Sequence, residues 1–197
     1  MTTGTGNAVV RGLGGDGIAD RVGRQASFAG VLIALGVGLE WVLDPQQRDG
    51  TVVRPAFFAV CVVATTIGFA LLASAAHALR RVASEHSKTV RVGSVMSTVG
   101  AGLLVAFAVT VLGTGLATGS PAVWSFIAFG LGMLLLSFGP VVLGLGLRRR
   151  LPGAWMLLVL AGVAAFAAIA IPLDPWHDVS LMAMCAAWTG VGVLLRR

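Results

Sequence analysis

Six long apolar runs, separated by short polar segments, follow a polar start in this chain. The polar segments contain most of the prolines and charged residues, and each apolar run is close to the length of about 20 residues that a helix needs to cross a bilayer. The sequence therefore predicts an all-α fold, a polytopic membrane bundle of six transmembrane helices in three hairpins. The expected spans are 26–43, 55–79, 92–116, 121–147, 155–171 and 179–195.

The polar start defines a second expected unit. Residues 1–23 are rich in glycine and threonine and contain no apolar centre, so we expect a disordered leader there. Residues 24–197 form the expected six-span domain. The hairpins also resemble one another, because each returns to an arginine pair or triple and the first and third share Leu-Asp-Pro at the turn. This repetition indicates either an internal duplication or a loop pattern on which six-span membrane proteins with short loops converge independently.

Composition supports a membrane location. Hydrophobic residues make up 57% of the chain and charged residues 11%, with a mean hydropathy of +0.92. A soluble domain with about 25% charged residues has far more polar surface to present to water. We therefore expect the lipid bilayer to be the main partner. Thirteen of the 14 basic residues are arginine, a usage typical of high-GC bacterial genomes, so we expect the bacterial inner membrane.

The net charge of +6 is explained by membrane orientation. The basic residues lie at loop ends without interleaved aromatic residues, which argues against nucleic-acid binding. Twelve of the 14 basic residues are expected at the membrane face that holds the N-terminus, and Arg48 and Arg54 are expected at the opposite face. Because cytoplasmic loops carry the excess of basic residues, we expect both termini to be cytoplasmic in a multi-pass protein of the cell membrane.

Small residues mark the expected packing faces. Gly93, Ser97 and Gly100 recur on one side of the third span, where they would admit a neighbouring helix closely. In the fourth span, Gly139 and Pro140 are expected to kink the helix or to leave a backbone carbonyl without a donor.

Acidic residues gather at the outer turns. Glu40 and Asp44 lie one turn apart, and the last turn carries Asp174, His177 and Asp178. If the first and last hairpins are neighbours, these groups could converge on a proton or a cation, including a divalent metal with oxygen ligands and one imidazole. The alternative is that they are solvated interfacial charges. Glu40 lies deepest, where a carboxylate is costly and is a functional candidate by default.

Two classes of function follow. Catalytic motifs of hydrolases and metalloproteases are missing from the sequence, and no lysine lies inside a span. We therefore expect no enzyme activity and no resident metal or cofactor. We expect Cys61 and Cys185 to be small, buried hydrophobic residues. The first class is transport or permeation of a small solute or cation through an acidic outer mouth. The alternative is a structural or accessory subunit that packs against a larger membrane complex or forms a homo-oligomer.

Overall fold

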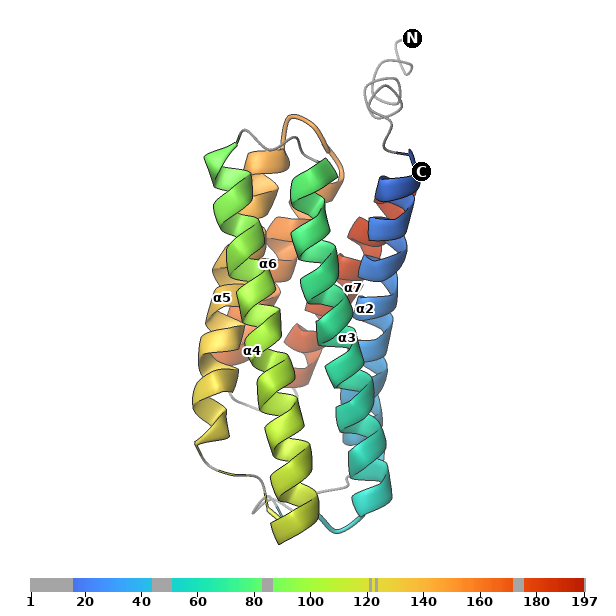
Figure 1. Cartoon of the computed structure of the whole chain (residues 1–197), viewed down its shortest axis with the longest axis vertical. Helices are drawn as coiled ribbons and strands as arrows, with labels where there is room; N and C mark the ends of the chain where they lie inside the picture. The colour runs from blue at the N-terminus through green and yellow to red at the C-terminus, as the bar shows by residue number, and fades with distance from the viewer. Residues whose placement is uncertain are drawn as a thin grey trace.

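The structure is a computed structural model that describes residues 16–43, 51–82, 87–120, 122, 124–171 and 176–196. These residues form six helices and no β-strand (Figure 1). The helices are α2 (Asp16–Leu43), α3 (Pro55–Val82), α4 (Lys88–Thr118), α5 (Ser125–Leu147), α6 (Ala154–Ala170) and α7 (Trp176–Leu195). The predicted helical bundle is confirmed.

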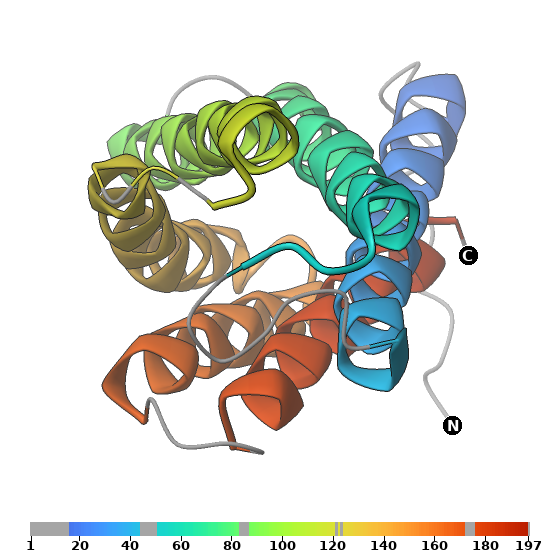
Figure 2. The same ribbon diagram turned by 90° about the horizontal axis from the view of Figure 1, so that it is seen from below.

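The six helices form a closed ring. Each helix packs against the next one along the chain, and α7 packs against α2 to complete the circle. Figure 2, viewed along the bundle, shows this arrangement around a common axis. Because neighbours in the chain run in opposite directions, an even number of helices brings both ends of the described chain to one end of the bundle. There Arg196 Nε lies 3.5 Å from the Asp20 carboxylate.

Five of the described helices are long and apolar enough to cross a membrane. The sixth, α6, has 17 apolar residues and extends about 25 Å at 1.5 Å per residue, slightly less than a typical hydrocarbon core. Large apolar side chains also point away from the ring, among them Phe28 with 61% and Ile127 with 67% of its surface exposed. A ring with an apolar outer surface of this kind suits lipid, so the fold is that of a multi-pass membrane protein.

The first helix begins earlier than the sequence predicted. Residues 16–23 were expected to belong to the disordered leader, but they form the first two turns of α2. Arg24 and Asp20 form an ion pair of 2.8 Å one turn apart, and Val22 is buried. Gly23 lies so close to α7 that an added Cβ would stand 2.6 Å from the Gly192 carbonyl oxygen. These tertiary contacts outweigh the weak helix propensity of the glycines. The rest of the predicted leader lies outside the described residues.

Glycines allow close contact between α4 and α5. A Cβ added at Gly100 would lie 2.8 Å from the Gly132 carbonyl oxygen, and one at Gly139 would lie 2.6 Å from the Ser97 backbone nitrogen. Within a bilayer, helices gain stability from such close van der Waals contact because lipid already surrounds their apolar side chains. The structure thus places Ser97, Gly100 and Gly139 at one helix–helix interface.

Pro140 lies in the same interface without ending the helix. Helix α5 runs continuously from Ser125 to Leu147 through Pro140, which is buried. Proline has no backbone N–H, so the Leu136 carbonyl has no donor at the usual fourth position along the helix. The neighbouring Ser137 hydroxyl donates to the Met133 carbonyl at 2.8 Å, one turn earlier.

Hydroxyl groups join α4 to α3. The buried Ser94 hydroxyl donates to the Ala76 carbonyl at 2.7 Å, and the Thr98 hydroxyl donates to the Ala73 carbonyl at 3.5 Å. Hydrogen bonds between transmembrane helices satisfy polar groups that lipid cannot. The helix that carries the glycine face is therefore fixed on both sides.

Candidate functional site

A cavity of about 440 Å³ occupies the interior of the ring in the half farthest from the termini. This half of the bundle is the one nearer the viewer in Figure 2. Five of the six helices line it, namely α2, α3, α4, α5 and α7. The lining residues are Ile33, Val37, Glu40, Trp41, Phe58, Cys61, Val62, Thr65, Phe69, Phe107, Ala108, Val111, Phe126, Phe129, Met133, His177, Asp178 and Leu181.

The charged lining residues all lie at the end of the cavity farthest from the termini, which we call its mouth. Glu40 comes one turn before the end of α2, and His177 and Asp178 belong to the first turn of α7. These helices are neighbours in the ring and run in opposite directions, so the end of one meets the start of the other. All three side chains line the same cavity at this junction. The structure therefore brings together three of the five predicted outer residues, and Asp44 and Asp174 lie outside the described part of the chain.

His177 is held in a defined orientation. Its Nδ1 lies 2.7 Å from the Ala168 carbonyl oxygen near the end of α6. A carbonyl can only accept a hydrogen bond, so Nδ1 carries the proton and donates it. The opposite ring nitrogen, Nε2, then accepts a hydrogen bond in the neutral imidazole and donates one in the imidazolium. This bond also links α7 to α6 next to the cavity.

The carboxylates of Glu40 and Asp178 have no ion-pair partner among the residues that the structure describes. The nearby Arg54 donates instead to the Leu43 carbonyl, with its Nη1 2.6 Å from that oxygen. A cation at the end of α2 satisfies a helix-terminal carbonyl and is favoured by the helix dipole. The ion pairs found in the described chain are those of Asp20, at the opposite end of the bundle. Among the described residues, the lining of the cavity therefore holds two carboxyl groups and no lysine or arginine.

The described residues give no support to a divalent-metal centre. Within them, no group of three histidine, cysteine, aspartate or glutamate side chains is arranged to hold a metal ion. A protein site for Zn²⁺ normally supplies at least three such ligands. Glu40, His177 and Asp178 share the cavity mouth without forming a set of that kind.

Aromatic side chains form much of the remaining wall, and the sequence pattern did not predict them. The Phe107 ring centroid lies 5.5 Å from that of Phe126 and 5.1 Å from that of Phe129, with tilted rings. On α3, the lining residues Phe58, Cys61, Thr65 and Phe69 recur at intervals of three and four. That spacing marks one helix face, but nothing local indicates that this face points into a cavity.

The half of the ring nearer the termini is filled by large side chains. Leu72, Leu104, Leu136, Met184 and Trp188 each have at most 1% of their surface exposed. Trp188 lies two turns deeper along α7 than the lining residue Leu181. Its indole nitrogen has no hydrogen-bond partner, the single buried side-chain nitrogen or oxygen of this kind in the described residues. The cavity thus lies in one half of the bundle, and the half nearer the termini is packed.

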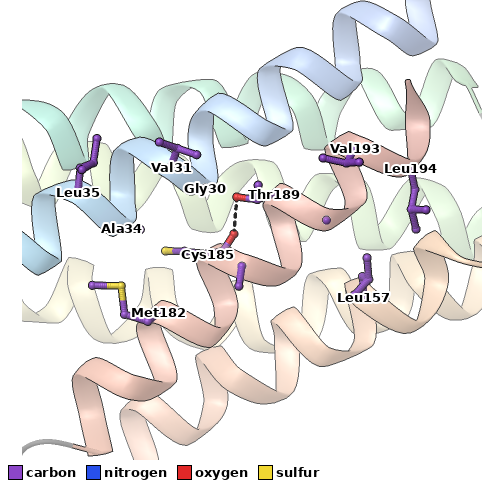
Figure 3. A pocket seen from close by; sticks show the side chains of 12 residues that line it. Gly30, Val31, Ala34, Leu35, Leu157, Met182, Cys185, Thr189, Val193 and Leu194 are labelled. Carbon is purple, nitrogen blue, oxygen red and sulfur yellow. Dashed lines mark hydrogen bonds between the residues drawn. The ribbon is translucent and has the colours of Figure 1, made fainter. Parts of the chain in front are cut away.

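A second hollow, about 720 Å³, lies on the outer surface between α2, α6 and α7 (Figure 3). Val31, Leu35, Met182 and Leu194 are among the apolar side chains that line it. Its Thr189 hydroxyl is already bonded to the Cys185 carbonyl at 2.9 Å, as the dashed line in Figure 3 shows. This outer groove has the character of a surface for lipid chains or for another apolar helix.

No known family model matches the sequence, and no curated protein or solved structure shows significant similarity to it.

Proposed function

We propose that this protein lies in the inner membrane of a bacterium with both termini in the cytoplasm. Ten of the eleven basic residues in the described part of the chain lie at the end of the bundle that holds the termini, and Arg54 lies at the other end. The positive-inside rule assigns the basic end to the cytoplasm. In this orientation the cavity opens to the exterior of the cell.

We further propose that the ring transports or conducts a small solute or cation. The observation that carries this proposal is the internal cavity whose mouth holds two carboxylates, Glu40 and Asp178, without an ion pair among the described residues. Ionisable groups inside a membrane protein are costly and commonly mark substrate or ion pathways. A purely structural bundle would gain stability by filling this space with apolar side chains.

The arrangement corresponds to a pathway open at one side. Negative charge at the mouth raises the local concentration of cations, while the packed layer around Trp188 closes the cytoplasmic half. Passage across the membrane requires that layer to open. In the outward-open state, a solute enters from outside and stops beside the aromatic wall.

This function is tested with the purified full-length protein in liposomes. We expect wild type to take up at least one of three labelled monovalent cations, rubidium, methylammonium or tetraethylammonium. Glu40→Gln should reduce that uptake by about tenfold, because one of two attracting charges in a low-dielectric site is lost. Asp20→Asn is the matched control, since it removes a carboxylate at the opposite end of the bundle and should leave uptake within about twofold. Absence of uptake for all three cations would contradict transport.

The alternative is a structural or accessory subunit of a larger membrane complex, and the outer groove favours it. Ala34 and Ala186 are among the residues that line it, and small residues let a partner helix approach closely. A stoichiometric protein partner that copurifies from native membranes, together with absent cation uptake, is the result expected for this alternative.

A further inference from the structure

The cavity combines three features that are not shared by any other part of the described molecule: enclosure within the ring, an aromatic wall and uncompensated carboxylates. Its volume of about 440 Å³ falls within the range of about 300–1,000 Å³ found for small-molecule sites. The charged groups lie at the mouth beside Trp41, Phe58 and Phe126, and the deeper lining is mostly apolar. A ligand that fits this order has a charged part and a large apolar surface.

The charge of the lining defines the sign of the ligand. Two carboxylates, Glu40 and Asp178, face at most one positive charge, on His177, and no lysine or arginine belongs to the lining. Even when the imidazole is protonated, one carboxylate is left without compensation. The mouth therefore favours a monovalent cation and opposes an anion.

The aromatic wall defines the chemistry of that cation. Phe107 contacts both Phe126 and Phe129 in tilted geometry, and Trp41 and Phe58 line the same space. The face of an aromatic ring attracts a cation, and the interaction is strongest where water is excluded. Quaternary ammonium groups are commonly recognised in this way.

The scarcity of oxygen ligands argues against a small inorganic ion at this site. Hard cations such as Ca²⁺ need six or more oxygen ligands to replace their water. The side chains of the lining supply two carboxylates and the Thr65 hydroxyl, which donates its proton to the Cys61 carbonyl at 2.9 Å. A weakly hydrated organic cation needs no such shell.

We propose that the cavity binds a lipophilic monovalent organic cation, such as a quaternary ammonium or phosphonium ion. Its charge lies near Glu40 and Asp178, and its apolar substituents lie against the aromatic wall around Phe107. This proposal names the substrate class for the transport function proposed above, and it rests on that function only for the step of passage across the membrane. Binding itself requires only the outward-open cavity.

The experiment measures binding of tetraphenylphosphonium to the purified full-length protein in detergent by calorimetry. We expect saturable binding at one site, and much weaker binding of the uncharged triphenylphosphine oxide. Glu40→Gln and Asp178→Asn should each weaken tetraphenylphosphonium binding by about tenfold. Phe107→Leu should weaken it by about fivefold, because leucine keeps the apolar contact and loses the ring face.

Phe166→Leu is the matched control for the aromatic wall. Phe166 is exposed on the outer surface, where its ring lies 6.5 Å from that of Phe138, so its replacement should leave binding unchanged. Equal binding of the charged and uncharged probes, or unchanged binding in both carboxylate variants, would overturn the proposal.

The same measurement separates this proposal from the transport function. Binding of tetraphenylphosphonium without cation uptake in liposomes supports the cation site and contradicts transport. Glu40-dependent rubidium uptake without tetraphenylphosphonium binding supports transport and overturns the proposed substrate class.

Discussion

Replacing Gly100 with isoleucine is expected to destabilise the whole bundle by about 3 kcal/mol, the upper end of the usual cost of overpacking. The new Cβ would lie 2.8 Å from the Gly132 carbonyl oxygen and 3.0 Å from the Leu136 backbone nitrogen. These are backbone atoms of α5, so the clash cannot be relieved by rotating a side chain. Helices α4 and α5 must move apart, which weakens their contacts along their whole length. Thermal unfolding in detergent measures the loss.

The control for this prediction lies two residues away on the same helix. Gly102 is exposed, and a Cβ added there meets no atom within 4 Å. Gly102→Ile should therefore leave stability unchanged or raise it slightly, since isoleucine has the higher helix propensity. An equal loss in both variants would show that the damage comes from isoleucine itself rather than from the α4–α5 contact.

Replacing Trp188 with alanine is expected to cost about 3–5 kcal/mol and to make the ring leaky. Trp188 is 1% exposed and is the largest fully buried side chain of the described residues. Its removal leaves a void below the cavity, in the packed layer that fills the half of the ring nearer the termini. We expect a lower unfolding temperature in detergent and faster rubidium leakage from liposomes that contain this variant than from those with wild type.

Trp188→Phe separates the closing of the ring from the chemistry of the indole. Phenylalanine keeps a large apolar ring and removes the buried N–H that has no partner. An unsatisfied buried donor costs about 1–3 kcal/mol, which offsets the smaller ring volume. This variant should remain within about 1 kcal/mol of wild type and should not leak. Leakage of Trp188→Phe equal to that of Trp188→Ala would contradict a sealing role.

Most helices were predictable because transmembrane length is a local property. A continuous apolar run such as 55–79 needs no knowledge of its neighbours, and helix α3 does begin at Pro55. The start of α2 at Asp16 was not predictable in this way. Its first two turns are polar and glycine-rich, and their stability comes from α7, more than 160 residues later in the sequence. The periodicity of the sequence does not indicate a contact between residues so far apart.

The candidate site was predictable only in part. Glu40 stands out in the sequence because a carboxylate inside an apolar run is unusual. Its meeting with His177 and Asp178 depended on the assumption that the first and last hairpins are neighbours, which the closed ring provides. The aromatic wall could not be predicted. Phe107 and Phe126 are ordinary apolar residues of transmembrane helices, and only the order of helices around the ring shows that they face inward.

The most direct test of a cavity that opens to the cell exterior is the accessibility of two introduced cysteines in intact cells. In a background with Cys61 and Cys185 replaced by alanine, single cysteines are introduced at Val37, which lines the cavity, and at Leu35, which lines the outer groove. A membrane-impermeant maleimide is then added outside the cells. We expect that Val37→Cys is labelled, that tetraphenylphosphonium slows this labelling, and that Leu35→Cys stays unlabelled within lipid. Labelling of Leu35→Cys alone, or of neither residue, would contradict a water-filled cavity open to the exterior.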